Sequence, residues 1–111
     1  MTPLEIAQGQ LDAYNLQDLD AHVAYFAEDV VIADLNGAVS LTGRVAYKER
    51  YAKVFGDFPQ NKVELVNRMV LGSTVIDHER VRRTPDAEPF DVIAIYTITG
   101  GKIARADFVR A

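Results

Sequence analysis

The sequence has no cysteine, no tryptophan and only two histidines. Without cysteine the chain forms neither a disulfide nor a thiolate metal site. The histidines, His22 and His78, lack the spacing of a metal-ligand pair, so no metal and no cofactor is predicted. His22 is expected at the surface or the boundary of a helix. No apolar run approaches the ~18 residues that span a bilayer, so no membrane association is expected.

The chain also lacks any concentration of positive charge. Its formal net charge is −4, and the basic residues are scattered. A nucleic-acid partner would require a basic patch for its phosphates, so none is predicted. The opening residues, "MTPLEIAQGQ", contain neither a basic segment nor the apolar core of a signal peptide. A cytoplasmic location is therefore expected.

What the sequence does contain is typical of one globular domain. The chain has 111 residues, of which 49% are hydrophobic and 25% charged. A chain of this length buries enough surface for one core. No repeat, linker or low-complexity tract divides it. Residues 1–111 are therefore predicted to form a single domain.

The N-terminal half is predicted to be mainly helical. Thr2 and Glu5 have the spacing of a capping box and open a first helix. A second, shorter helix is predicted over residues 18–29 and a third over residues 42–58. Between them, the β-branched residues 29–34 predict a short strand that ends in a turn.

The C-terminal half is predicted to form two β-hairpins. Their turns fall at Gly72-Ser73 and Gly100-Gly101, because glycine supplies the positive φ of tight turns. The four strands are expected at residues 62–71, 74–83, 90–99 and 102–110. Helices followed by antiparallel strands predict an α+β fold, with a curved sheet and helices packed on one face.

The turn at Gly72-Ser73 sets the register of the first hairpin. It places Leu71 opposite Thr74, and Asn67 opposite His78. This face is apolar near the turn, so it is predicted to be the inner one. Its members are Val63, Leu65, Asn67, Met69, Leu71, Thr74, Ile76, His78, Arg80 and Arg82.

The other face of this hairpin gathers opposite charges. Arg68 lies opposite Asp77, with Glu79 on the diagonal, and such pairs are typical of a solvated or subunit-facing surface. A slip of one residue would exchange the faces and place both acids inside.

The second hairpin is interpreted in the same way. Ile93, Ile95 and Phe108 are predicted to lie on the concave side, where small alanines leave room. The alternating residues, which include Tyr96 and Asp107, are predicted to face outward. Their mixture of aromatic, charged and aliphatic side chains favours a homodimer interface on the outer sheet face.

The order of these elements resembles the nuclear transport factor 2-like superfamily, in its SnoaL-like and ketosteroid-isomerase-like groups. The resemblance rests on "YNLQDLDAHVAYFAEDVVIADLNG", "TGRVAYKERYAKVF", "NRMVLGSTVIDHERV" and "GGKIARADF". It implies a conical α+β barrel of the cystatin-like roll type, in which three helices wrap a curved antiparallel sheet around a deep pocket. It also implies dimerisation through the outer face, and isomerase, cyclase, hydrolase or binding functions. Because one fold hosts many functions, the site has to decide among them.

Residue by residue, the resemblance places Asp34 at the general base of ketosteroid isomerases. Tyr14 resembles their oxyanion tyrosine, although Gln10 holds the matching position. Ile93 stands where those enzymes have a protonated aspartate. Two of three polar catalytic groups are therefore missing, so a true steroid isomerase is not predicted. Asp107 lies near the final acid of the related epoxide hydrolases.

The predicted catalytic set is Asp34, His78 and Asn67. Asp34 ends an apolar strand, where lost hydration would raise its pKa and make it a general base. His78 would exchange a second proton, and Asn67 would orient it or bind an oxyanion. A small apolar or amphipathic molecule with a carbonyl or epoxide group would be the substrate. Its predicted contacts are Tyr14, Tyr51, Phe55, Met69, Ile76, Arg80, Ile93, Ile95 and Phe108.

Two other functions remain open at this point. A ligand-binding module without catalysis would have the same cavity, and substitution of Asp34 would alter affinity alone. A protein-interaction domain would instead use the outer sheet face and have a small or filled cavity.

Overall fold

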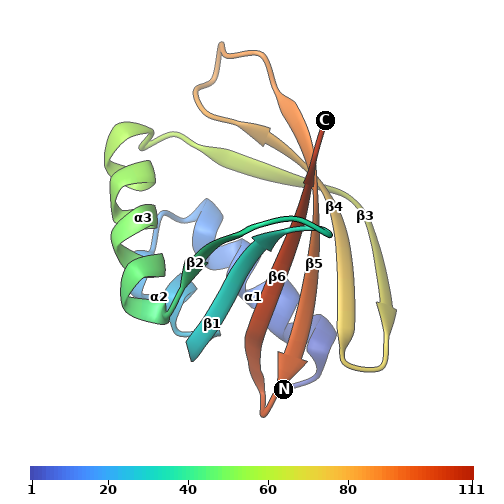
Figure 1. Cartoon of the computed structure of the whole chain (residues 1–111). Helices are drawn as coiled ribbons and strands as arrows, with labels where there is room; N and C mark the ends of the chain where they lie inside the picture. The colour runs from blue at the N-terminus through green and yellow to red at the C-terminus, as the bar shows by residue number, and fades with distance from the viewer.

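The helices pack together at one side of the molecule (Figure 1). A computed structural model describes all of residues 1–111. Helix α1 (Pro3–Asn15) begins at the predicted capping box: the Thr2 hydroxyl accepts from the Glu5 N–H (3.2 Å), and the Glu5 carboxylate accepts from the Thr2 N–H (2.8 Å). Helices α2 (Leu19–Val23) and α3 (Arg44–Asp57) follow. Helix α2 is shorter than predicted because the strand after it begins already at Phe26.

The strands form one curved, open sheet. Its strands are β1 (Phe26–Asp34), β2 (Val39–Thr42), β3 (Lys62–Leu71), β4 (Thr74–Arg82), β5 (Phe90–Thr99) and β6 (Lys102–Arg110). Their order across the sheet is β2-β1-β6-β5-β4-β3, and only the β1–β6 pair is parallel. The helices cover the concave side of this sheet, which confirms the predicted α+β class (Figure 1).

The first hairpin keeps its predicted register near the turn but has its faces inverted. Leu71 pairs with Thr74 and Asn67 with His78, as expected. However, the face that points to the core is the other one, and its β4 members Val75, Asp77, Glu79 and Val81 are all buried. The prediction that His78 and its neighbours face inward is wrong.

Two local features explain this inversion. The hairpin tip extends beyond the core, and Leu71 there is 86% exposed, so apolar residues near the turn do not mark the inner face. A β-bulge between Leu65 and Asn67 shifts the strand by one residue. Val63 therefore shares the inner face with Val81 instead of the face of Asn67.

The second hairpin also turns where expected, and a register shift again changes the faces. Tyr96, which was predicted to face outward, is buried on the inner face opposite Ala106, and Phe108 lies opposite Ala94. The inward placement of Phe108 is therefore confirmed. Ile93 and Ile95 lie on the outer face, contrary to prediction.

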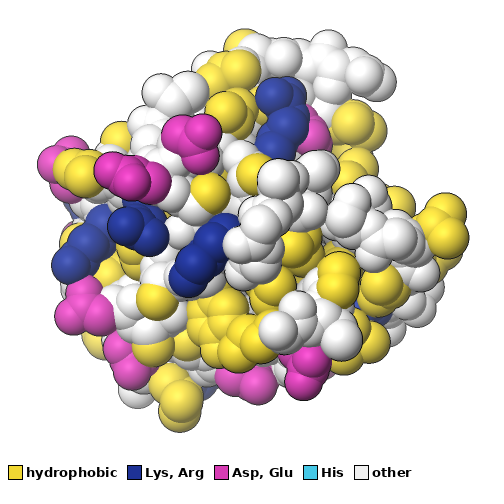
Figure 2. All heavy atoms as spheres, turned by 90° about the horizontal axis from the view of Figure 1, so that it is seen from below, with side chains coloured by type: hydrophobic (Ala, Val, Ile, Leu, Met, Phe, Trp, Pro, Cys, Tyr) yellow, Lys and Arg dark blue, Asp and Glu magenta, His cyan; other side chains and the backbone are white.

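The hydrophobic core lies between the helices and the inner sheet face. Its larger cluster includes Ile6, Phe26, Val30 and Ile103. On the surface seen from the side of the hairpin turns, charged side chains of both signs are interspersed with exposed hydrophobic ones (Figure 2). No helix is both long enough and apolar enough to cross a bilayer.

Candidate functional site

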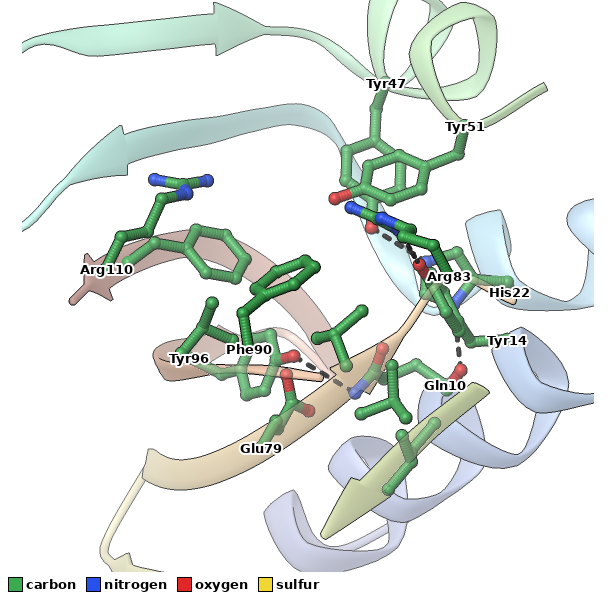
Figure 3. Close-up of a pocket in the computed structure, with 15 residues that line it drawn as sticks. Gln10, Tyr14, His22, Tyr47, Tyr51, Glu79, Arg83, Phe90, Tyr96 and Arg110 are labelled. Atoms are coloured by element: carbon green, nitrogen blue, oxygen red, sulfur yellow. Dashed lines mark hydrogen bonds between the residues drawn. The ribbon is translucent and has the colours of Figure 1, made fainter. Parts of the chain in front are cut away.

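A cavity of about 100 Å³ lies between α1, α3 and the inner sheet face (Figure 3). Most of its lining is apolar or aromatic, with a few polar groups that converge from different elements, as in small-molecule sites. The lining residues are Gln10, Leu11, Tyr14, His22, Tyr47, Tyr51, Val63, Glu79, Val81, Arg83, Phe90, Val92, Tyr96, Phe108 and Arg110.

Glu79 is the carboxyl group of this cavity. It is 6% exposed, and no protein group donates a hydrogen bond to its side chain. Burial raises the pKa of Glu79 to about 8; the negative charge of Asp77 adds to this effect and the positive charge of Arg68 opposes it. At neutral pH the protonated acid therefore predominates over a minor carboxylate form.

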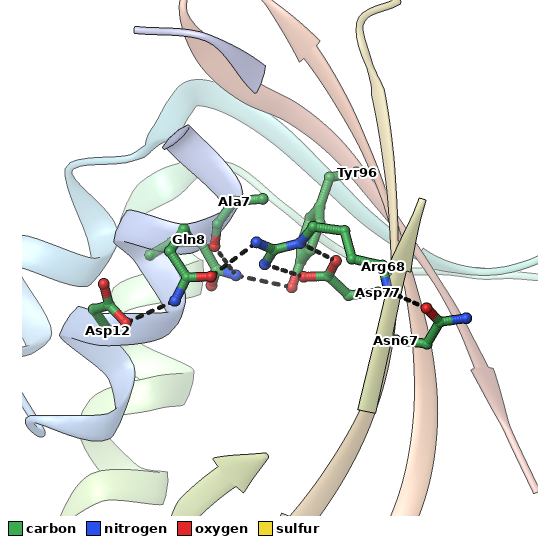
Figure 4. Close-up of polar contacts among 8 residues, drawn as sticks. Ala7, Gln8, Asp12, Asn67, Arg68, Asp77 and Tyr96 are labelled. Carbon is green, nitrogen blue, oxygen red and sulfur yellow. Dashed lines mark hydrogen bonds and ion pairs between the residues drawn. The ribbon is translucent and has the colours of Figure 1, made fainter. Parts of the chain in front are cut away.

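The neighbouring acid, Asp77, is neutralised by a dedicated partner (Figure 4). The Arg68 guanidinium donates from Nε and Nη2 to the two oxygens of Asp77, at 2.7 and 2.9 Å. A third donor of Arg68, Nη1, binds Oε1 of Gln8 in α1 at 2.8 Å. Because these two hydrogen bonds keep the Arg68 guanidinium paired with Asp77, Glu79 has no cationic side chain as a direct partner.

Two phenols that line the cavity keep a proton to donate. The Tyr96 hydroxyl accepts from Nε2 of Gln10 at 3.2 Å, and it lies next to the Glu79 carboxyl in Figure 3. The Tyr14 hydroxyl accepts from Asn61 and, at 3.2 Å, from Arg83. A hydroxyl that accepts in this way can still donate its own hydrogen, here to a ligand oxygen in the cavity.

His22 is a fixed neutral imidazole in the cavity wall. Burial lowers its pKa to about 4, against a smaller opposite effect of the backbone hydrogen bond to Gln10. A carbonyl only accepts, so Nδ1–H donates to the Gln10 carbonyl (2.8 Å), and Nε2 accepts from the Tyr47 hydroxyl (2.8 Å). The expectation of a surface histidine is wrong. No three His, Asp or Glu side chains lie close enough together to hold a metal ion.

The comparisons with known proteins identify the family. A family model described as the SnoaL-like domain matches residues 7–106. This chain belongs to the SnoaL-like domain family. A comparison with curated proteins found no match.

Solved structures support the same placement of this SnoaL-like domain. An uncharacterized cystatin-fold protein from Novosphingobium aromaticivorans is 35% identical, with 99% of each chain covered and a TM-score of 0.91. A candidate polyketide cyclase from Sinorhizobium meliloti is 26% identical, with 98% of this chain and 100% of that chain covered and a TM-score of 0.79. A candidate ketosteroid isomerase from Kribbella flavida, 16% identical over 98% of this chain and 77% of that chain, has a TM-score of 0.82 and shows the shared fold.

The predicted catalytic residues of the SnoaL-like domain are not brought together. Asp34 has a side chain that is 59% exposed outside the cavity, where it accepts from Arg110 at 2.7 Å. His78 lies on the outer sheet face and bonds Asp91 at 2.8 Å. Asn67 is exposed, and its Oδ1 accepts from the Arg68 backbone N–H. The shared pocket predicted for these residues is therefore wrong, for two reasons: strand β1 ends at the solvent, and the first hairpin has its faces inverted.

The predicted binding residues divide between the two faces. Tyr14, Tyr51 and Phe108 line the cavity, and their contact with a ligand stays a prediction. Phe55 packs edge-on against Tyr14, with ring centroids 5.0 Å apart, and belongs to the core behind the lining. The remaining five lie outside the cavity, contrary to prediction: Met69, Ile76, Arg80, Ile93 and Ile95.

Glu79 was missed as a site residue although the sequence contains a signal for it. Val75, Asp77, Glu79 and Val81 alternate along β4, and the two valines at the ends of this set mark the buried face. Arg83 has no comparable signal, because it lies in the loop after β4, where no periodicity fixes the direction of a side chain.

Proposed function

We propose that this SnoaL-like domain is an enzyme that moves a proton on a small carbonyl compound, with Glu79 as the acid–base group. The main support is a single observation: Glu79 is a buried carboxyl with a pKa of about 8, and it faces a cavity without a hydrogen-bonding partner. General acid–base groups work best when their pKa lies near the working pH. The named relatives include candidate cyclases and isomerases, which fits this class of chemistry.

The proposed step uses the minor carboxylate form of Glu79. The carboxylate takes a proton from the carbon next to the substrate carbonyl, and the electron pair moves onto the carbonyl oxygen. The Tyr96 and Tyr14 hydroxyls donate to this oxyanion in the mainly apolar cavity. The Glu79 acid then returns the proton to the same or another carbon, so the protein ends unchanged.

The test is hydrogen–deuterium exchange in deuterated water, followed by proton NMR on a panel of small ketones and oxo acids. The wild-type protein is expected to accelerate exchange next to the carbonyl. The exchange rate of the Glu79→Gln variant should be at least about tenfold lower than that of the wild type, because general acid–base groups contribute about 10²–10⁴-fold to the rate. Glu64→Gln, which removes an exposed carboxylate from neighbouring β3, is the matched control and should behave as wild type.

Two outcomes would contradict the proposal. Equal exchange rates in the wild type and Glu79→Gln would show that Glu79 takes no part in the proton transfer. Binding of panel compounds without any exchange would instead indicate the non-catalytic binding module, in which Glu79 serves affinity alone.

We also propose that two copies associate through the outer sheet face. Helices cover only the concave side, and Ile76, Ile93 and Ile95 are half-buried on the other side. Ion pairs within one chain neutralise charges next to these isoleucines: the Arg105 guanidinium lies 3.0 Å from the Asp107 carboxylate, and the Arg80 guanidinium lies 2.9 Å from the Asp91 carboxylate. A second copy would therefore cover the aliphatic side chains beside charges that already have a partner.

The association is tested by sedimentation velocity of wild-type protein and Ile95→Lys. Ile95 lies beside Ile76 and Asp107 in the sheet. Because Arg105 already pairs with the Asp107 carboxylate, a lysine at position 95 would be buried in a dimer without a partner of its own. The wild type is expected to be a dimer and the variant a monomer. Val45→Lys, at an exposed position of α3, is the control and should remain a dimer. A monomeric wild type, or a dimeric Ile95→Lys, would refute the interface.

A further inference from the structure

Arg83 is a cation at the cavity that no carboxylate neutralises. It begins the loop between β4 and β5 and belongs to the lining of the cavity. None of the ion pairs in the protein includes it. In Figure 3 its side chain lies beside Tyr14 and Tyr51, on the helix side of the cavity.

The guanidinium of Arg83 is held in place by neutral groups only. Its central carbon lies 5.3 Å from the ring centroid of Phe90 and 5.7 Å from that of Phe58. One donor, Nη1, binds the Tyr14 hydroxyl at 3.2 Å. An arginine carries five N–H donors, so most of this fork remains free to bind another acceptor.

The other ionisable groups of the lining leave the cavity with a net positive character. Glu79 is mostly protonated at neutral pH, and His22 is neutral. Arg110 is already paired with Asp34. The free positive charge of Arg83 thus favours an anion, and a carboxylate matches the planar fork of a guanidinium.

The size of the cavity limits what else such an anion can carry. Its volume is about 100 Å³. Ligand pockets for drug-sized molecules commonly have volumes of about 300–1,000 Å³, so this cavity suits a smaller ligand. A short acyl chain attached to a carboxylate is a ligand of this kind.

We propose that Arg83 binds the carboxylate of the substrate, which makes the substrates small oxo acids. The carboxylate lies against Arg83, and the carbonyl lies farther in, within reach of Tyr96 and Glu79. The position of the substrate carbonyl rests on the proposed function of Glu79, whereas the position of the substrate carboxylate rests on Arg83 alone.

Isothermal titration calorimetry at neutral pH tests the binding of a carboxylate to Arg83 without requiring catalysis. The probes are butanoate, 2-oxobutanoate and levulinate, each compared with its methyl ester, which lacks the charge and carries one additional methyl group. The wild-type protein is expected to bind at least one acid about tenfold or more tightly than its ester, because only the acid forms a charge-assisted pair with the arginine.

Variants assign this preference to one residue. Arg83→Gln should reduce the preference to about twofold or less, and Arg83→Lys should retain part of it because the charge remains. Lys53→Gln removes a positive charge from the exposed side of α3, away from the cavity, and should keep the full preference. Circular dichroism confirms that each variant is folded.

The outcomes separate this proposal from the role of Glu79. If Glu79→Gln loses proton exchange but keeps the preference for acids, both proposals hold. If proton exchange does not depend on Glu79 while the preference for acids disappears in Arg83→Gln, the carboxylate site is supported and the acid–base role of Glu79 is refuted. If no acid is bound better than its ester, or if the preference survives Arg83→Gln, the carboxylate site is refuted.

Discussion

Replacement of Arg68 by methionine is expected to lower the free energy of unfolding by about 3 kcal/mol or more, because it leaves one partner of a buried ion pair without the other. The Asp77 side chain is 0% exposed and that of Arg68 is 11% exposed. Methionine retains much of the apolar stem of arginine, so the expected loss comes mainly from the uncompensated carboxylate. Chemical denaturation at neutral pH measures the effect.

Two further variants separate charge from packing. Lys53→Met breaks an ion pair with Asp57 on α3, where both side chains are exposed and water replaces the lost partner, so its cost should be much smaller. The double variant Arg68→Met/Asp77→Asn removes both charges and should recover a large part of the lost stability. If Arg68→Met were no more costly than Lys53→Met, the loss of the Arg68 charge would not leave a buried, uncompensated carboxylate.

The elements of this fold could be predicted from local sequence signals. The capping box at Thr2 fixes the start of α1 through two short-range hydrogen bonds. The glycines at 72 and 100 adopt positive φ, and both hairpins turn where those residues predict. The cross-strand pair of Arg68 with Asp77 follows from the same turn. Each of these features depends on residues that are close in the sequence or joined by a tight turn.

Local signals for the inner and outer faces of the first hairpin conflict: Val75 and Val81 mark one face of β4, whereas the apolar residues near the turn mark the other, and long-range packing decides between them. Arg68 and Asp77 were correctly paired but placed at the surface, because opposite charges are usually solvated. In the structure, the pair is buried under α1, where Gln8 takes a further donor of the guanidinium. The bulge after Leu65 cannot be read from the sequence, since no glycine marks it. Glu79 became a candidate only when this packing was known.

Stability should also depend on pH through Glu79, and this dependence tests its environment without any substrate. Its pKa is about 8 in the folded protein, against 4.5 as the ordinary value, so the folded state binds a proton that the unfolded state has already released. Folding is therefore favoured at low pH, and the stability falls as the pH rises from about 4.5 to 8. The slope is at most about 1.4 kcal/mol per pH unit.

His22 has the opposite effect in a lower range of pH. Its pKa is lowered from 6.5 to about 4 on folding, so the unfolded state binds the proton first and stability is lost as the pH falls below 6.5. The two slopes oppose each other between about pH 4.5 and 6.5, and only that of Glu79 remains above it. A comparison of wild type with Glu79→Gln cancels the contribution of His22, which both proteins share.

The expected result is that Glu79→Gln becomes more stable relative to wild type, by roughly 3 kcal/mol, between pH 5 and pH 8.5. Glutamine has the shape of the protonated acid but cannot ionise, so the variant does not incur the cost of a buried carboxylate at high pH. Urea unfolding of both proteins at half-unit pH intervals measures the difference, and Glu64→Gln, which removes an exposed acid, should show no such trend. A constant difference between wild type and Glu79→Gln across this range would mean that Glu79 ionises as it would in water, and its proposed acid–base role would lose its physical basis.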